Sequence, residues 1–150
     1  MNILFLTLLD FTTIEDRGIY TDLMREFVNE GHKVYIISPT EKRKNEPTRL
    51  IDNGDFKILK LQIGNIQKTN IIEKGISTLT LEPKFKLAIK KFFNNIKFDL
   101  ILYSTPPITL QKAVEFVKRR DNAKTYLLLK DIFPQNAVDL GILKTSGVKS

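Results

Sequence analysis

Runs of apolar residues without polar interruption mark four segments of the chain as buried β-strands. These segments are residues 2–9, 33–38, 98–103 and 125–129. A fifth segment, residues 56–63, alternates apolar and polar side chains, and Lys57, Lys60 and Gln62 supply the polar positions. Alternation is typical of a strand with one exposed face, so we predict that this strand lies nearer the sheet edge and is less buried than its neighbours.

Three further segments repeat apolar residues at helical spacing. The first helix opens at Gly18 and stops at Gly31, the second begins at Glu82 and Pro83, and the third covers residues 110–120. Phe85, Ile89, Phe92 and Phe93 form an aromatic stripe on the second helix, which we expect to pack in the core.

The isoleucines of residues 64–81 favour a helix, but Gly75 and several Thr and Ser residues interrupt every helical period. The sequence therefore leaves the conformation of this segment open, and a mobile or substrate-covering segment is one alternative. Residues 41–47 are charged and unpatterned, which predicts an exposed loop.

Alternating strands and helices with short joints predict a doubly wound α/β sheet of Rossmann-like, parallel type. Sequential crossovers give the strand order 3-2-1-4-5, with the direction of progression reversing between the first and fourth strands. Residues 10–18, 104–107 and 130–136 then converge at that switch point. Ligands of open α/β sheets bind at such a place, so we expect the functional site there.

The segment of residues 126–143 joins a strand to a proline-stiffened turn. Lys130 and Asp131 come at the carboxyl end of the strand, and Pro134 favours the first turn of a helix that Gly141 would stop. A carboxylate at this position suits catalysis, and it equally suits capping of the following helix. Asp131 therefore has two open roles, which can coexist.

Composition narrows the function classes. A chain of 150 residues with 42% hydrophobic residues forms one domain with a core, and the absence of cysteine excludes disulfides and thiolate chemistry and indicates a reducing, cytoplasmic setting. A single histidine excludes a histidine-rich metal cluster. Residues 3–9 lack the flanks of a signal peptide, and no apolar run is long enough to span a membrane.

The net charge of +7 and a pI near 9.6 predict an anionic partner, or else merely a lysine-rich solvated surface. A nucleic-acid module stays open as a rival function, but most aromatic residues fall at buried periods, so no nucleic acid is expected. The lysines of the second helix are candidates for contact with an anionic membrane surface. They are Lys84, Lys86, Lys90 and Lys91, with Lys68 and Lys74 before them.

Three common occupants of a switch-point crevice are disfavoured by the sequence. Residues 10–18 contain only Gly18, not the GxGxxG of a dinucleotide site, and no P-loop motif is present. A receiver domain would use Asp10, Thr105 and Lys130, but it also needs an acidic phosphoacceptor where Ile63 and Gly64 stand.

The segment KDIFPQNAVDLGIL, residues 130–143, resembles a motif of bacterial sugar transferases in glycosyltransferase family 4. GHKV at residues 31–34 is similar to the GHxV that follows the first helix of that family, and STPP at residues 104–107 resembles the end of its fourth strand. The resemblance covers most of the chain and is weakest between residues 52 and 93.

The resemblance implies the GT-B architecture of two Rossmann-like domains. Residues 1–150 correspond to the amino-terminal, acceptor-side domain, and the carboxyl-terminal donor domain is expected to be absent, so the isolated fragment is expected to be inactive. The implied reaction is metal-free, retaining transfer of a sugar from a UDP- or GDP-linked nucleotide sugar, with no further cofactor, to a lipid-linked saccharide. Such transfer builds capsule, O-antigen or exopolysaccharide. A GT-B sugar-nucleotide epimerase is the alternative enzyme.

The resemblance and the strand ends together give the site expectations. Asp131 is the catalytic candidate, and no metal ligand is expected. Arg17 stands where relatives often carry paired glycines near the donor phosphates, and it can supply charge in their place. The candidate substrate-binding residues are Arg17, Gly18, Ser104, Thr105, Lys130, Gln135 and Asn136. His32 is expected to be a turn residue away from the crevice. The expected location is the cytoplasm, with peripheral attachment to the inner face of the cell membrane left open.

Overall fold

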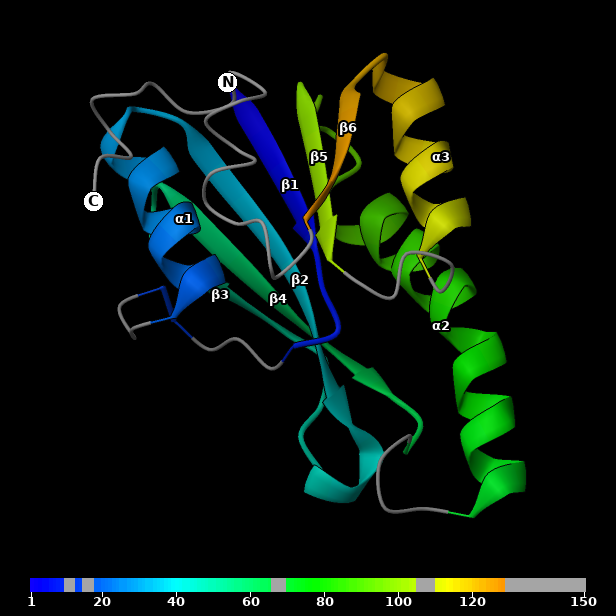
Figure 1. The fold of residues 1–150 in the computed structure, drawn as a ribbon. Coiled ribbons are helices and arrows are strands. Elements are labelled where there is room, and N and C mark those ends of the chain that lie inside the picture. Colours follow the sequence, from blue (N-terminus) through cyan, green and yellow to red (C-terminus); the bar gives the residue numbers. More distant parts are fainter. Residues whose placement is uncertain (10–12, 15–17, 66–69, 105–109, 129–150) are drawn as a thin grey trace.

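The computed structural model describes residues 1–9, 13–14, 18–65, 70–104 and 110–128. These residues form a six-stranded sheet with three α-helices and one 3₁₀ turn (Figure 1). The elements are β1 (Asn2–Leu6), α1 (Ile19–Asn29), β2 (Lys33–Glu41), η1 (Lys42–Lys44), β3 (Arg49–Asp52), β4 (Phe56–Ile63), α2 (Ile71–Phe92), β5 (Leu100–Ser104), α3 (Gln111–Asp121) and β6 (Lys124–Leu128).

The strand order is β3-β4-β2-β1-β5-β6, and every pairing is parallel except that of β3 with β4. Without β3, this is the order 3-2-1-4-5 predicted from the sequence, so the Rossmann-like prediction is confirmed. Phe5 of β1 faces Ile36 of β2 on one side and Leu102 of β5 on the other. The most continuous apolar runs therefore occupy the centre of the sheet.

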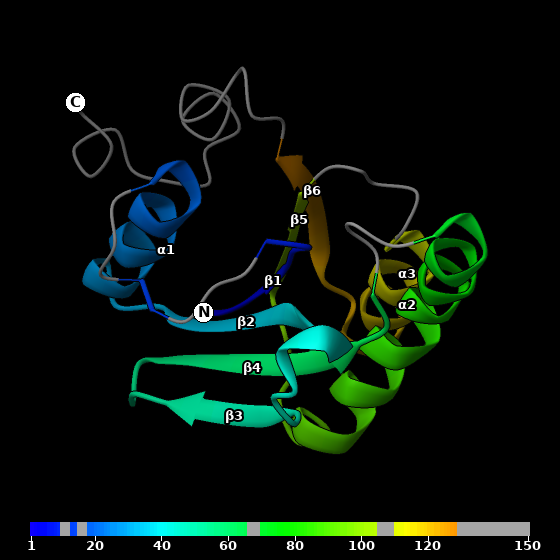
Figure 2. The same ribbon diagram turned by 90° about the horizontal axis from the view of Figure 1, so that it is seen from below.

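Helices cover both faces of the sheet, as expected for a doubly wound fold (Figure 2). Figure 2 shows α1 on one face and both α2 and α3 on the other. Below α1, the core contains Phe5, Met24 and Phe27. On the opposite face, the rings of Tyr35, Phe93 and Phe98 meet edge to face with centroids 5.3–5.9 Å apart.

The sequence pattern missed β3, a short strand that pairs antiparallel with β4. The hairpin turn uses Gly54 at φ 83°, and the Asp52 carboxylate accepts a hydrogen bond from its amide at 3.0 Å. Because β3 forms the edge, β4 is hydrogen-bonded on both sides. Ile58 and Leu59 are fully buried, but only five of the eight β4 residues are buried, against seven of nine in β2 and four of five in β1 and in β5. The predicted lower burial of residues 56–63 therefore holds against these three strands.

The edge position belongs instead to β3 at one end and, within the described residues, to β6 at the other. Tyr126 and Leu127 of β6 are only partly buried, and Leu128 is the buried residue of this strand. The apolar run at residues 125–129 predicted a strand covered on both faces, and that expectation is wrong for its first residues.

Helix α2 begins eleven residues before the predicted start at Glu82 and Pro83. The Asn70 side chain caps it by accepting a hydrogen bond from the Glu73 amide at 2.7 Å. Pro83 lies inside the helix, and Gly75 is also accommodated within it. The sequence left the conformation of residues 64–81 open, and the structure assigns residues 71–81 to α2. The predicted core role of Phe85, Ile89 and Phe93 is confirmed.

A close contact holds the middle of α2 against the sheet. A Cβ placed on Gly64, just after β4, would stand 2.2 Å from the Ser77 hydroxyl, so only glycine admits this approach. Ser77, Leu81, Phe85 and Ala88 then follow each other along the buried side of the helix. The tertiary contacts of this face, rather than local propensity, extend α2 through Gly75 and Pro83.

The amino end of the sheet is held by Asp121, the last residue of α3. Its carboxylate accepts hydrogen bonds from the Phe98 amide at 2.9 Å and from Arg120 Nε and Nη2, both at 2.7 Å. Burial alone would raise the pKa of Asp121, but the hydrogen bonds from Arg120 and Phe98 outweigh it and hold the pKa below its ordinary value.

Candidate functional site

The carboxyl ends of β1, β5 and β6 lie side by side, since Leu6 pairs with Tyr103 and Ser104 pairs with Leu128. The chain therefore leaves β1, β5 and β6 at the same end of the sheet, where the carboxyl ends of the parallel strands lie. The switch point between β1 and β5 lies at this end of the sheet, which is where the sequence predicted the functional site.

Thr7 and Ser104 join the first two of these strand ends. Their hydroxyl oxygens are 3.1 Å apart, and both residues are buried. Thr7 Oγ1 also accepts a hydrogen bond from the Leu9 amide at 3.0 Å, which fixes the start of the loop after β1. Ser104 was predicted as a substrate-binding residue, and the structure places it as a link between β1 and β5.

A buried lysine continues this polar cluster on β2 and β4. Lys60 is 1% exposed, and its Nζ donates to the Ser38 hydroxyl at 3.2 Å across the parallel pair. Ser38 in turn donates to the carbonyl of Leu9. Burying an ammonium group without a hydrogen-bond partner is costly, so the hydrogen bond to Ser38 helps to stabilise Lys60 in its buried position.

Sequence reasoning treated Lys60 as an exposed position of an alternating strand. The signal that could have identified it is the spacing from Ile58, because residues two apart in a strand share a face. Ile58 packs in the core below α1, so Lys60 belongs to the same covered face. On this face of β4 the buried side chain changes from apolar at Ile58 to charged at Lys60.

The same face carries Thr40, which is 2% exposed and whose Oγ1 has no hydrogen-bond partner within the described part of the chain. Thr7, Ser38, Thr40, Lys60 and Ser104 all lie on the α1 face of the sheet, toward the strand ends. We name these five residues the polar floor. A set of buried hydroxyls and one ammonium below a helix start suits the support of an anion-binding loop.

The helix start above this floor is that of α1. Gly18 is its exposed N-cap residue in extended conformation, and no described side chain caps the first turn. Arg25 ties the preceding loop to the helix by donating from Nη1 to the carbonyl of Ile14 at 2.6 Å and by pairing with Asp22. Tyr20 packs against Phe5, and burial raises the pKa of its hydroxyl. The first amides of α1 point toward this end of the sheet, as the start of a helix must, and such an end favours an anion.

The other predicted site residues lie outside the described residues. They are Arg17, Thr105, Lys130, Asp131, Gln135 and Asn136. Of the predicted set, the structure therefore locates Gly18 and Ser104, one at the start of α1 and one at the end of β5.

His32 lies at the opposite end of the sheet, directly before β2, and its Nδ1 is 3.0 Å from the Met1 ammonium. Among the described residues, no group of three His, Cys, Asp or Glu side chains could hold a metal ion.

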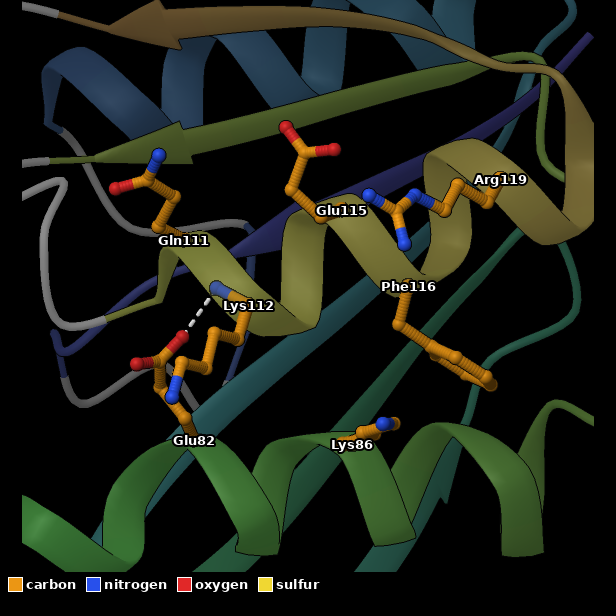
Figure 3. A pocket seen from close by; sticks show the side chains of 7 residues that line it. All are labelled: Glu82, Lys86, Gln111, Lys112, Glu115, Phe116 and Arg119. Carbon is orange, nitrogen blue, oxygen red and sulfur yellow. Dashed lines mark hydrogen bonds between the residues drawn. The ribbon is translucent and has the colours of Figure 1, made fainter.

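A separate groove of about 690 Å³ lies between α2 and α3 (Figure 3). Figure 3 shows Glu82, Lys112 and Gln111 at one end of the groove, and Phe116 and Arg119 toward the other. Glu82 accepts a hydrogen bond from the Lys112 amide and so caps the first turn of α3. The lining is mixed in charge, which matches a contact between two helices better than a site for one anionic ligand.

Comparison with solved structures now places the fold. The chain is similar to a trehalose-6-phosphate synthase from E. coli, a GT-B glycosyltransferase, in a structure bound with UDP-2-fluoro glucose. The TM-score is 0.54 at 8% identity, and the match covers 93% of this chain and 37% of that one. The fold is that of a Rossmann-like domain.

A second similar structure is the C-terminal domain of PF1911 hydrogenase from Pyrococcus furiosus, with a TM-score of 0.51 at 13% identity over 84% of this chain and 89% of that one. No known protein family and no curated protein matches the sequence. At these identities both likenesses establish the fold alone. The chain spans just over a third of the length of the trehalose-6-phosphate synthase structure.

Proposed function

We propose that this chain is the acceptor-side domain of a GT-B glycosyltransferase that uses a nucleotide sugar. The observation that carries the proposal is the likeness of nearly the whole chain to part of a glycosyltransferase structure with a bound nucleotide-sugar analogue. The resemblance of residues 130–143 to a sugar-transferase motif supports it independently, because that segment follows directly from the strand end at the switch point.

The polar floor supports the same proposal through its position. The hydroxyls of Thr7 and Ser104 hold the carboxyl ends of β1 and β5 together. The Ser38 hydroxyl, which accepts a hydrogen bond from Lys60, fixes the carbonyl of Leu9. The loop after β1 therefore starts from a fixed base near the start of α1. We assign the donor diphosphate to the loop and helix start at Arg17 and Gly18, where helix amides and a guanidinium favour negative charge.

In the proposed reaction, a hydroxyl of the acceptor forms a bond to the anomeric carbon while the bond from that carbon to the diphosphate breaks. The hydroxyl proton leaves with the departing phosphate, and anomeric configuration is retained. Asp131 is the proposed catalytic residue, because a carboxylate at the strand end can orient and stabilise the reacting sugar. Thr105, Lys130, Gln135 and Asn136 are proposed to bind substrate beside it. No metal is needed for this scheme.

The proposed acceptor is a lipid-linked saccharide, and the proposed product belongs to a bacterial surface polysaccharide made at the cytoplasmic side of the membrane. A second domain has to supply most of the donor contacts and close over the sugar to exclude water. For this reason residues 1–150 alone are expected to show no transfer.

The test is a product analysis on the chain joined to its donor-binding domain. UDP- and GDP-linked sugars are incubated in turn with a lipid-linked acceptor, and mass spectrometry reads the acceptor and the nucleotide sugar. The proposal predicts an acceptor heavier by one sugar for at least one donor. An epimerised nucleotide sugar with an unchanged acceptor would assign the epimerase function instead, and transfer by residues 1–150 alone would contradict the need for a second domain.

A nucleic-acid function has less support in the described residues. Base stacking requires exposed aromatic rings between basic side chains. Here Phe5, Phe27, Phe85, Phe93 and Phe98 are all buried, and Phe116 is a half-buried ring that lies beside Lys86, Lys90 and Arg120.

A further inference from the structure

Helix α2 is apolar on two opposite sides, and only one of them packs on the sheet. Ser77, Leu81, Phe85, Ala88 and Ile89 are buried against the domain. The large apolar side chains that remain exposed on this helix are Ile71 at 88%, Ile72 at 77%, Ile76 at 60%, Leu79 at 80% and Leu87 at 63%. No other described element exposes so much aliphatic surface.

Four of these residues and Pro83 form a continuous line, which we name the outer stripe. Its members are Ile72, Ile76, Leu79, Pro83 and Leu87. At 100° per residue they fall within a sector of roughly 80°, centred opposite the buried side. The spacing follows the i, i+4, i+7 rule of an amphipathic helix, so the outer stripe is a second apolar face that points away from the core.

The surroundings leave the first half of the outer stripe uncovered among the described residues. Figure 1 shows the first turns of α2 extending well past the start of α3, at the level where β2 and β4 end. Stretched over fifteen residues, the stripe is roughly 22 Å long. A single line of that length can lie flat on a surface.

The charges on this helix are mainly positive, although exposed Glu73 lies beside Ile72 at the start of the stripe. Helix α2 carries five lysines and two glutamates, and Lys86, Lys90 and Lys91 are exposed near the stripe. One of the two glutamates, Glu82, turns its carboxylate to the Lys112 amide of α3. The ammonium groups of Lys86 and Lys90 lie 5.2 Å from the Phe116 ring, on flexible stems that can reach a neighbouring anion.

A protein partner fits this surface less well than a lipid one. Protein interfaces centre on aromatic and arginine side chains, whereas the stripe is aliphatic and most charges on its helix are lysines. A second copy of the chain would bring like charges together. An aliphatic stripe on a helix with an excess of lysines matches an anionic bilayer, where the apolar face enters the boundary between headgroups and acyl chains and the lysines meet lipid phosphates.

We propose that the outer stripe of α2 is a membrane-docking face that inserts into the surface of an anionic bilayer. Ile72, Ile76 and Leu79 enter the lipid, and the lysines of the same helix bind the phosphates. The docking stands apart from the transferase proposal, since it needs no sugar. None of the helices in the described ranges is long and apolar enough to cross a membrane, so the contact is peripheral.

The test is sedimentation of the 150-residue chain with vesicles of equal parts phosphatidylglycerol and phosphatidylcholine. Ile76→Gln/Leu79→Gln should lower the partition coefficient about tenfold or more, because glutamine loses the apolar contact and keeps the helix. The matched control is Ile19→Gln/Leu50→Gln, at two residues that are each 38% exposed on other elements, and it should stay within about twofold of the parent.

Two further measurements separate the contributions. Leu87→Gln, in the well-packed half of α2, should also weaken binding while the thermal midpoint stays unchanged. Lys84→Gln/Lys86→Gln/Lys90→Gln/Lys91→Gln should weaken binding at low salt and much less at high salt.

Three outcomes would overturn the proposal. They are a parent chain that does not sediment with these vesicles, an Ile76→Gln/Leu79→Gln variant that binds as well as the parent, and a dimeric parent that this variant makes monomeric in light scattering without loss of vesicle binding. The last outcome would assign the stripe to self-association.

Discussion

At the residue scale, Ser38 connects three parts of the candidate site. Its hydroxyl contacts Lys60 Nζ and the Leu9 carbonyl, and it lies in the buried part of β2. Ser38→Ala leaves both groups without this partner and should lower the free energy of unfolding by about 1–3 kcal/mol. Urea denaturation of the two proteins measures the difference.

Thr40 provides the opposite case two residues further along the same face. Its buried hydroxyl has no partner among the described residues, so Thr40→Val replaces it with a methyl group of the same shape. The free energy of unfolding should stay equal or rise by about 1 kcal/mol. A loss comparable to that of Ser38→Ala would mean that the Thr40 hydroxyl has a partner in the site.

Asp121 gives the fold a pH dependence. Its pKa is lowered in the folded protein, so its contribution is fully present above the ordinary value of about 3.9 and is lost as the pH falls through the lower folded value. Asp121→Asn removes a carboxylate that accepts three hydrogen bonds and should cost about 2 kcal/mol at neutral pH. The difference from the parent should shrink below pH ~4, where the parent also loses the charge. A constant difference down to pH ~2 would assign the effect to packing.

At the element scale, the start of α2 is the clearest departure from the sequence pattern. Two changes test it, because both lie far before the predicted start at Pro83. Asn70→Ala removes the cap and should cost about 1 kcal/mol, whereas Gly75→Ala, at a position with no atom near its added Cβ, should stabilise by up to about 1 kcal/mol. Thermal unfolding and helical circular dichroism measure both. No effect from either change would indicate that the helix begins later.

The reasons for success and failure differ between elements. The central strands were predictable because Ile3, Ile36 and Leu102 sit in uninterrupted apolar runs, which only a covered strand needs. The first half of α2 was not, because Gly75 and Pro83 are local breakers that the Ser77 and Leu81 contacts override. β3 is four residues long and mostly exposed, so its sequence carries little pattern.

At the scale of the whole molecule, the sheet order followed from connection rules, and with it the end of the sheet where the candidate site is placed. The residues of the candidate site were harder to predict from the sequence. Lys60 was hidden in an apparent alternation, and the buried link of Thr7 with Ser104 depends on two strand ends that are 97 residues apart in the sequence. No local pattern records such a pairing. The outer stripe of α2 was equally invisible before the buried side of that helix was known.

The central claim is that sugar transfer takes place at the carboxyl ends of these strands. Asp131→Asn in the chain joined to its donor-binding domain tests this claim most directly. Asparagine keeps the ability to cap a helix but loses the charge, so the variant separates catalysis from capping. The matched control is Asp55→Asn, at an exposed residue before β4 at the opposite edge of the sheet.

Transfer to a lipid-linked acceptor is followed by mass spectrometry. The account predicts product from the parent and the control, and a rate about a hundredfold or more lower for Asp131→Asn with an unchanged thermal midpoint. A parent that forms no product with any nucleotide sugar, or an Asp131→Asn variant that transfers at the parent's rate, would contradict it.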